Sequence, residues 1–225
     1  MPLLSVVIPV YNEAKTIAQL IERVGAVNID KEIIVVDDGS TDGTGKILRS
    51  INLTHLKVIH HSTNRGKGSA FLTGLSHASG EFVIIQDADL EYQPEEYVKL
   101  MEEIKRGNAD LVLGARFTKG YHGSFIPRLG NRFLTSFLNF LFAAKLNDFF
   151  TCYKLCRREA LMGLSLASSS FDMDAEIVAK ALKRKWRITE VPIEYLPRSY
   201  AEGKKIRIKD GISAMVSMIK YRIKG

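Results

Sequence analysis

Short apolar runs rich in valine and isoleucine alternate with segments of helical spacing throughout the first half of the 225-residue chain. The runs predict strands at Leu4–Val10, Glu32–Val36, Leu56–His60, Phe82–Ile85 and Asp110–Leu113. The segments between them predict helices at Ala14–Val24, Thr44–Ile51, Gly68–Ala78 and Pro94–Arg106. Buried-type strands that alternate with helices indicate an α/β fold, in which helices cover both faces of a mostly parallel sheet.

The second half of the chain is less regular. Apolar residues lie nearly all round a predicted helix at Asn131–Lys145, an amphipathic helix is predicted at Asp174–Lys185, and a strand at Trp186–Ile193. A basic loop, Arg198–Lys209, leads to a predicted terminal helix at Gly211–Ile223. Neither a repeat nor a linker interrupts the sequence. We therefore expect a single α/β domain over residues 1–225 that carries a helical, basic appendage.

Composition narrows the class of protein. Lys and Arg outnumber Asp and Glu by 32 to 25, a formal net charge of +7, which favours an anionic partner such as nucleotide phosphates, nucleic acid or a lipid surface. The longest apolar stretch, Phe133–Ala144, is about half of the ~20 residues that a spanning helix needs, so an integral membrane protein is not expected. Cys152 and Cys156 have no paired second cluster, which favours reduced thiols in a cytoplasmic protein over a disulfide framework or a zinc site.

Charged residues follow the predicted strands, at the edge where parallel sheets bind ligands. Asp37 and Asp38 follow the second strand, Asp87 and Asp89 the fourth, and Arg116 the fifth. Carboxylates crowded on one rim repel each other unless a cation or hydrogen-bond donors compensate. Carboxylate oxygens suit Mg²⁺ or Mn²⁺, and such an ion also binds diphosphate oxygens.

The two common phosphate-binding loops are missing from the sequence. It contains no Gly-x-x-x-x-Gly-Lys-Ser/Thr, and the Gly-x-Gly-x-x-Gly fingerprint fails after both Gly43-Thr44-Gly45 and Gly66-Lys67-Gly68. An ordinary ATPase and a nicotinamide dehydrogenase are therefore not expected. A nucleotide bound here would have its phosphates held by a metal and by charged side chains.

Four motifs carry a resemblance to a known family: SVVIPVYNEA at 5–14, EIIVVDDGSTDGT at 32–44, NRGKGSA at 64–70 and the Asp-Ala-Asp turn at 87–89. Together they resemble the inverting family 2 glycosyltransferases of the GT-A fold. QDADLEYQPEEY at 86–97, GARF at 114–117, the Glu190-Val191-Pro192 strand and the late Arg198 further resemble the dolichol-phosphate mannose synthase group. The resemblance implies a Rossmann-like, mostly parallel sheet, with residues 1–120 binding a nucleotide sugar and residues 121–225 facing the acceptor and the membrane.

The same resemblance implies roles for individual residues. The nucleotide base and ribose would be contacted by Pro9, Tyr11, Glu13, Val36 and Asp38. The sugar and diphosphate would meet Asp87, Ala88 and Asp89. A Mg²⁺ or Mn²⁺ ion would be held by Asp89 first, with Asp87 and with Glu91, where the group often has Gln. The diphosphate or the acceptor phosphate would be met first by Arg116 and Arg198, and then by Arg128, Arg132, Lys204 and Lys205.

Charge decides which acceptor fits such a site. The nucleophile attacks C1 of the sugar opposite the leaving diphosphate, which inverts the anomeric centre. A hydroxyl acceptor needs a general base, for which Asp172, Asp174 and Glu176 are candidates, although Asp172 fits equally well as the cap of the helix that follows. A lipid phosphate is already anionic and needs cations instead. We therefore expect transfer of one hexose to a dolichyl or undecaprenyl phosphate, from GDP-mannose or UDP-glucose, with mannose favoured by the resemblance.

A lipid acceptor draws attention to the helices of the second half. Phe133–Phe142 is rich in Phe and Leu and is flanked by basic residues, which suits a helix lying in the headgroup region. The terminal helix pairs apolar residues with Lys220, Arg222 and Lys224, which anionic lipid would attract. The alternative for both helices is packing on the sheet or a dimer contact. We expect peripheral association with the cytoplasmic membrane face, and the sequence leaves a separate membrane-anchoring subunit open.

Other classes of protein fit the sequence less well. A nucleotidyltransferase that makes sugar nucleotides would have a Gly-rich, basic motif after the first strand, where this chain has Tyr11-Asn12-Glu13. A nucleic-acid-binding module would interleave aromatic and basic residues on a sheet face, whereas here the aromatic residues cluster at 133–150 and the early strand ends are acidic. No nucleic-acid partner is expected. The remaining alternative is a family 2 enzyme that uses a UDP-sugar or acts on a sugar hydroxyl in glycan or polysaccharide assembly.

Overall fold

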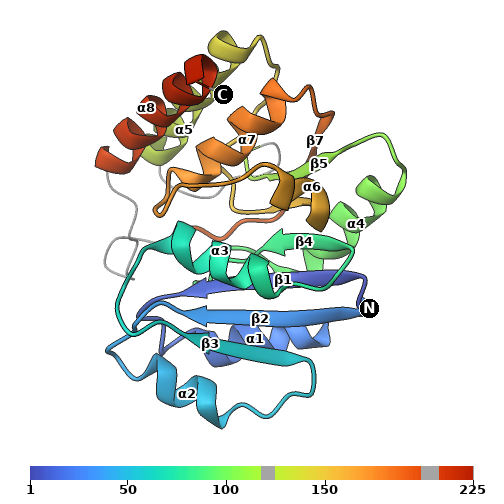
Figure 1. Cartoon of the computed structure of the whole chain (residues 1–225), viewed down its shortest axis with the longest axis vertical. Coiled ribbons are helices and arrows are strands. Elements are labelled where there is room, and N and C mark those ends of the chain that lie inside the picture. The colour runs from blue at the N-terminus through green and yellow to red at the C-terminus, as the bar shows by residue number, and fades with distance from the viewer. Residues whose placement is uncertain (118–124, 199–207, 225) are drawn as a thin grey trace.

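The computed structural model describes residues 1–117, 125–198 and 208–224, and in this part of the chain a seven-stranded sheet forms the centre of the molecule (Figure 1). The strands lie in the order β3-β2-β1-β4-β6-β5-β7. Their bounds are β1 Leu4–Val10, β2 Lys31–Asp37, β3 Leu56–His60, β4 Phe82–Ile85, β5 Leu111–Ala115, β6 Lys154–Arg157 and β7 Ile188–Pro192. Helices flank the sheet: α1 Ile17–Ala26, α2 Thr44–Ser50, α3 Lys67–His77, η1 Pro94–Glu96, α4 Tyr97–Lys105, α5 Phe125–Phe142, α6 Arg158–Gly163, α7 Met173–Lys183 and α8 Ile208–Lys224. The predicted α/β class with a mostly parallel sheet is confirmed.

The parallel part of the sheet follows from the apolar runs. β1 lies between β2 and β4, with Val6 opposite Ile33 on one side and Ile84 on the other. Every residue of β1 and β4 is buried, as expected for strands that have helices on both faces. Because β1, β2, β3 and β4 all run in the same direction, their carboxyl ends meet at one edge of the sheet.

The sequence does not predict one strand, β6. It lies antiparallel between β4 and β5, with Val83 opposite Cys156 and Val112 opposite Leu155. Its residues, Lys-Leu-Cys-Arg, include no β-branched or aromatic side chain, so local propensity does not indicate a strand. β6 therefore links the parallel strands β1–β4 to β5, and β5 in turn pairs in parallel with β7, so all seven strands form one sheet.

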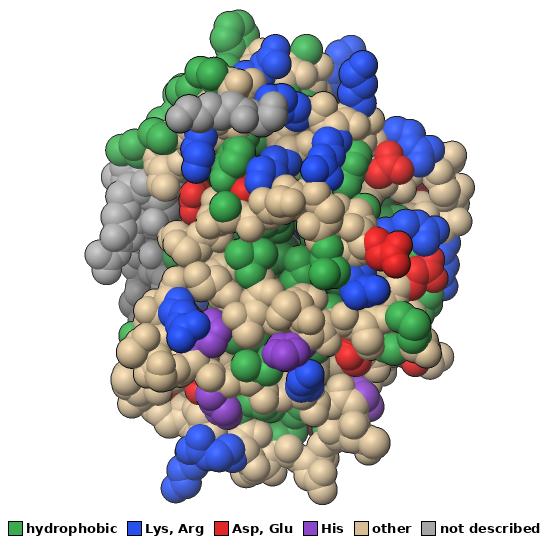
Figure 2. Space-filling view, in the orientation of Figure 1, with side chains coloured by type: hydrophobic (Ala, Val, Ile, Leu, Met, Phe, Trp, Pro, Cys, Tyr) green, Lys and Arg blue, Asp and Glu red, His purple; other side chains and the backbone are tan. Residues whose placement is uncertain are grey.

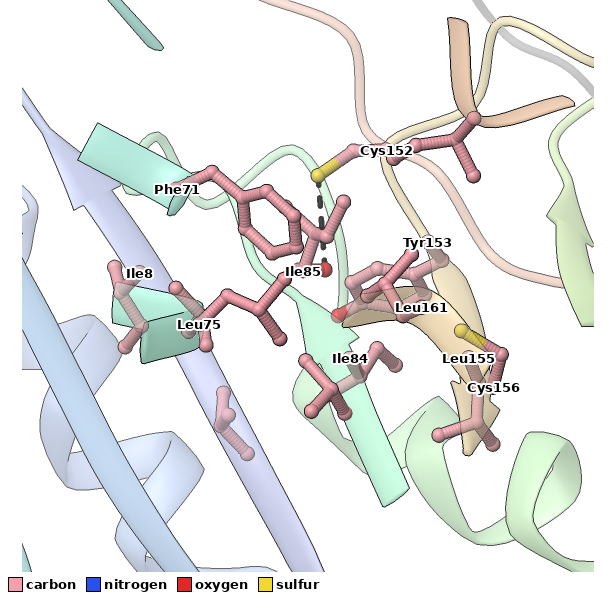
Figure 3. Close-up of a cluster of buried hydrophobic side chains, with 14 of the residues drawn as sticks. Ile8, Phe71, Leu75, Ile84, Ile85, Cys152, Tyr153, Leu155, Cys156 and Leu161 are labelled. Atoms are coloured by element: carbon pink, nitrogen blue, oxygen red, sulfur yellow. Dashed lines mark hydrogen bonds between the residues drawn. The ribbon is translucent and has the colours of Figure 1, made fainter. Parts of the chain in front are cut away.

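The core beside β4 is built from side chains of both halves of the chain. Figure 3 shows Phe71 and Leu75 of α3 gathered with Ile85 of β4, with Cys152 above them. Cys152 and Cys156 are both buried free thiols, as predicted, and the Cys152 Sγ lies 3.6 Å from the carbonyl oxygen of Ile85. The thiols therefore behave as small core residues.

Helix α3 lies directly on the sheet because it carries a glycine at the contact. A Cβ atom on Gly74 would lie 2.4 Å from Cγ1 of Val7 and 3.3 Å from Cγ2 of Val36. Only glycine allows this close approach of helix and strand. The side chain of Val36 is consequently fully buried beneath α3.

Three helices of the second half pack together at one end of the molecule (Figure 1). The helix predicted at Asn131–Lys145 extends from Phe125 to Phe142, and α8 packs against it and against α7 through Ala214 and Met218. In the part of the chain that the structure describes, none of the helices has the length and apolar character needed to cross a bilayer.

Of the two roles left open for Asp172, a side-chain cap of α7 is not formed. Asp172 stands at the N-cap position, but its side chain makes no capping hydrogen bond. Its carboxylate instead accepts hydrogen bonds from the hydroxyls of Ser168 (3.0 Å) and of Ser217 in α8 (2.9 Å). Because α8 offers a second hydroxyl, the carboxylate joins the terminal helix to the loop before α7.

Candidate active site

A cavity of about 270 Å³, hereafter the strand-end cavity, opens at the carboxyl ends of the parallel strands. Most of the site residues predicted from the sequence line it: Pro9, Tyr11, Glu13, Asp38, Asp87, Ala88, Asp89, Glu91, Arg116 and Arg198. Asp174, one of the candidate general bases, lines it too, and residues to which the sequence analysis gave no role complete the lining, among them Lys67, Phe150, Phe171 and Tyr195. Residues more than a hundred positions apart therefore share one site.

Three other predicted site residues that the structure describes do not line the cavity. Val36 was expected near the nucleotide, but its side chain points under α3, because neighbouring residues of a strand face opposite sides of the sheet. Arg128 and Arg132 are exposed on α5. Lys204 and Lys205 lie outside the described residues.

The Asp-Ala-Asp turn follows β4 and presents two carboxylates to the cavity. Burial, together with the charges of Asp87 and Glu91, raises the pKa of Asp89 to about 7. Burial also disfavours the charged form of Asp87, but the ammonium of Lys67, 2.6 Å away, outweighs it and lowers the pKa of Asp87. Asp87 thus has a counter-ion of its own, whereas Asp89 shares Arg198 with Glu13 and lies beside two further carboxylates.

Arg198 connects the two acidic sides of the cavity. Its guanidinium lies 3.1 Å from the carboxylate of Glu13 and 3.2 Å from that of Asp89, and these carboxylates raise its pKa against the opposing effect of burial. The Nε–H of Arg198 is buried and has no hydrogen-bond partner among the residues that the structure describes. An unpaired buried donor costs free energy, and an anionic oxygen in the cavity would satisfy it.

Glu91 does not complete a metal site with the two aspartates. Its carboxylate accepts hydrogen bonds of 2.6 Å from the Tyr195 hydroxyl and from the Arg198 backbone N–H. Within the ranges that the structure describes, no three His, Cys, Asp or Glu side chains are placed to hold one ion. The predicted three-carboxylate arrangement is therefore not formed, because Glu91 anchors the segment at 195–198.

Asp87 and Asp89 nevertheless suit a divalent cation. Mg²⁺ is commonly held by one or two carboxylates together with phosphate oxygens of the substrate rather than by a protein cage. Two aspartates on one cavity rim provide those ligands, and a cation would offset both the burial and the neighbouring carboxylates that raise the pKa of Asp89.

Arg116 is held by a partner that the sequence analysis did not identify. Asp148 accepts hydrogen bonds from its Nε (2.8 Å), its Nη2 (2.7 Å) and its backbone N–H (3.0 Å). The Asp148 side chain is fully buried. An aspartate within the apolar stretch Leu146–Phe150 was the available signal, since a buried carboxylate requires a partner. Arg116 thus lines the cavity with its orientation fixed.

The Asp38 carboxylate is engaged in hydrogen bonds within the protein. Its carboxylate accepts hydrogen bonds from the backbone N–H of Arg65 (3.0 Å) and Gly66 (2.8 Å), and Nδ1 of His61 lies 2.7 Å away. These contacts hold the loop that precedes α3 and so place Lys67 opposite Asp87. The sequence motif at 64–70 contained this lysine, but nothing in the sequence alone indicated its partner.

The candidate general bases are engaged as well. Asp174 lines the cavity, but it forms an ion pair of 2.7 Å with Lys154 and lies 3.9 Å from Lys67. Glu176 accepts hydrogen bonds from two backbone N–H groups at 167–168 and pairs with Lys180 at 2.7 Å. A carboxylate paired with an ammonium is a poor proton acceptor.

Comparison with known proteins identifies the family of this chain. The model of "Glycosyl transferase family 2" matches residues 5–164. A polyprenol monophosphomannose synthase of Mycolicibacterium smegmatis is 30% identical over 98% of this chain and 87% of its own length. A dolichol-phosphate mannosyltransferase of Pyrococcus furiosus (30%) and the low-salt glycan biosynthesis hexosyltransferase Agl6 of Haloferax volcanii (32%) match 89% and 88% of the chain, which spans only 58% and 48% of these relatives.

Solved structures show the same fold. Glucosyl-3-phosphoglycerate synthase from Mycobacterium tuberculosis, crystallised with Mn²⁺, UDP and phosphoglyceric acid, has a TM-score of 0.77 at 19% identity, and the match covers 99% of this chain and 79% of that one. A crystal of the same enzyme with Mg²⁺ and UDP gives a TM-score of 0.75. With its sheet, its acidic strand ends and more than half of its length matched by the family model, this chain belongs to glycosyl transferase family 2.

Proposed function

We propose that the protein transfers one hexose, with mannose favoured, from a nucleotide sugar to a polyprenyl phosphate, with inversion at the anomeric carbon and with Mg²⁺ or Mn²⁺ bound at Asp87 and Asp89. The two relatives at 30% identity that are named as mannosyl-transferring enzymes of dolichol or polyprenol phosphate support the acceptor class. The donor class is supported by family membership and by the acidic rim of the cavity.

The observation that carries the proposal is the charge state of the cavity. Asp174, the candidate base that lines the cavity, is paired with Lys154, whereas Arg198, which lines the same space as Arg116 and Lys67, has a buried Nε–H without a partner among the described residues. A hydroxyl acceptor would need a free base to remove its proton. A phosphate acceptor arrives deprotonated and needs positive charge to approach the donor diphosphate, which arginine supplies through paired N–H groups.

In this proposal, different residues of the cavity have different roles in the reaction. Pro9, Tyr11, Glu13 and Asp38 form the side nearest β1 and β2, where the nucleoside would lie. A divalent cation bound by the aspartates would neutralise the departing diphosphate and hold its oxygens. Arg198 and Arg116 would align the acceptor phosphate and stabilise charge as an acceptor oxygen bonds to C1 and the bond from C1 to the diphosphate breaks.

The helices at the end of the molecule offer a surface for the lipid. Phe133 and Phe140 of α5 are 60% and 84% exposed, and α8 exposes an apolar face of its own, spaced three and four residues apart: Ile212, Val216, Ile219 and Ile223. Figure 2 shows hydrophobic side chains gathered with Lys and Arg at this end. Apolar faces bordered by basic residues suit the headgroup region of an anionic membrane.

The transfer reaction can be measured directly. Purified protein would be incubated with Mn²⁺ and radiolabelled GDP-mannose or UDP-glucose, each with and without a short-chain polyprenyl phosphate. Label that enters the organic phase only when lipid phosphate is present would support the proposal and identify the donor. Donor hydrolysis without labelled lipid would overturn the acceptor assignment and favour a sugar hydroxyl. No turnover of either donor under any condition would contradict the donor pair.

A further inference from the structure

Gln86 is a fully buried amide that immediately precedes the Asp-Ala-Asp turn. Its backbone N–H donates to the carbonyl of Val7 in β1 (2.9 Å), so its position is set by the sheet. Its side chain is enclosed by Tyr97 of α4 and by Tyr153, which precedes β6 and is labelled in Figure 3. A polar side chain in such a place must satisfy its hydrogen bonds internally.

Every contact of this amide has a defined direction. The carbonyl oxygen of Asp87 can only accept, so the amide nitrogen of Gln86, 2.9 Å away, faces it and donates. The amide oxygen therefore faces the phenols, and it accepts a hydrogen bond from Tyr97 and another, of 2.7 Å, from Tyr153. Burial raises the pKa of both phenols, so both remain neutral donors. The two tyrosines thus fix the amide, and the amide fixes the Asp87 carbonyl.

The turn is held from its other side as well. The hydroxyl of Thr16, at the start of α1, donates to the carbonyl of Ala88 (2.7 Å). Leu90, which follows the turn, has a φ of +63°, a conformation that costs free energy for a residue with a branched side chain. The backbone at 87–90 therefore depends on its surroundings for its shape, and that shape sets where the carboxylates of Asp87 and Asp89 point.

We propose that Gln86, oriented by Tyr97 and Tyr153, is a positioning residue that aims the Asp87 and Asp89 carboxylates at the divalent cation and donor diphosphate. The inference rests on the proposed function, because it assigns these carboxylates to the cation. Removing a residue that orients a metal ligand through a hydrogen bond typically weakens metal binding about 10-fold to 100-fold.

Variants can separate positioning from stability. In Gln86→Met the Asp87 carbonyl loses its donor and both phenols lose their acceptor, so the fold is weakened too. In the triple variant Gln86→Met, Tyr97→Phe, Tyr153→Phe the orphaned hydroxyls are also removed. Replacing all partners of a buried hydrogen bond by apolar groups of similar shape is nearly neutral for stability. The triple variant should therefore unfold in urea closer to the wild type than Gln86→Met does, because only the Asp87 carbonyl is left without its donor.

The measurement is the dissociation constant of Mn²⁺, followed by the electron paramagnetic resonance of the free ion in the presence of UDP or of GDP. We expect at least about a tenfold increase in the triple variant. Ser5→Ala is the matched control. Ser5 is also fully buried and donates to Glu32 (2.5 Å), but it lies near the amino end of β1, away from the strand-end cavity. It should lower the free energy of unfolding and leave Mn²⁺ binding unchanged.

The outcomes distinguish this inference from the proposed function. Weaker Mn²⁺ binding in a triple variant that is fully folded under the assay conditions supports the positioning role. Mn²⁺ binding within twofold of the wild type in that variant overturns it and leaves the proposed function standing. Wild-type protein that binds no Mn²⁺ with either nucleotide contradicts the metal assignment itself, and the positioning role with it.

Discussion

Asp89 gives the most quantitative prediction. Its pKa of about 7 in the folded protein compares with an ordinary value of 3.8, because the carboxylate is buried beside Asp87 and Glu91. The folded protein therefore holds this proton until about pH 7, whereas the unfolded chain releases it near pH 4. Between these values the folded state binds more protons, so the free energy of unfolding falls as the pH rises and levels off above pH 7.

Asp89→Asn removes this titration and keeps the shape of the side chain. Each pKa unit corresponds to about 1.4 kcal/mol, and about two of the roughly three units lie between pH 5 and pH 7. The variant should therefore gain stability over the wild type by up to about 3 kcal/mol as the pH rises from 5 to 8. Exchange of protons with the neighbouring carboxylates reduces the gain, and about 1–3 kcal/mol is expected.

The assay is urea unfolding of both proteins from pH 5 to pH 8, without added metal, followed by the same series with Mn²⁺ and a nucleoside diphosphate. Without metal, the difference between variant and wild type should grow with pH. With metal and nucleotide at pH 8, the wild type should be stabilised and the variant should not. A difference that stays constant from pH 5 to pH 8 would refute the argument that charge crowding at the turn is relieved by protonation or by a cation.

Three further predictions test other parts of the molecule. Asp148→Ala leaves the buried Arg116 guanidinium without its carboxylate and should lower the free energy of unfolding by about 3–5 kcal/mol in urea, and a loss below 1 kcal/mol would contradict the ion pair. Arg198→Ala should lower kcat/KM in the transfer assay at least about tenfold, since it removes the cation that spans both sides of the cavity, and unchanged kinetics would exclude that role. The double variant Phe133→Ser, Phe140→Ser should weaken flotation with anionic vesicles, whereas Met162→Ser, an exposed apolar residue on α6, should not, and equal flotation of all three proteins would exclude this face as the membrane contact.

Much of the fold could be predicted from local pattern. Four strands of the first half, β1, β2, β4 and β5, are almost entirely buried and therefore appear in the sequence as continuous apolar runs. Because parallel strands end at one edge, the residues that follow those runs were expected to share a site, and the cavity contains Glu13, Asp38, Asp87 and Asp89 together. These inferences needed only the period of the pattern and the direction of the chain.

Other features depended on contacts between distant residues. β6 lacks any local strand signal and forms because the gap between β4 and β5 binds both of its edges. Val36 belongs to a motif that resembles a nucleotide-binding segment, yet its side chain faces α3, since the pleat of β2 decides its direction. Asp172 stands where the sequence allows a helix cap, but its carboxylate instead accepts a hydrogen bond from the Ser217 hydroxyl of α8.

The sequence by itself determined the class of fold, the edge of the sheet that binds ligands and the acidic turn at its centre, because spacing along the chain encodes each of these. Only the tertiary structure decided which charges are paired. Lys67 with Asp87, Arg116 with Asp148, and Arg198 with Glu13 and Asp89 join residues 20 to 185 positions apart. Ion pairing depends on distance and burial in space, and neither can be calculated before the chain has folded.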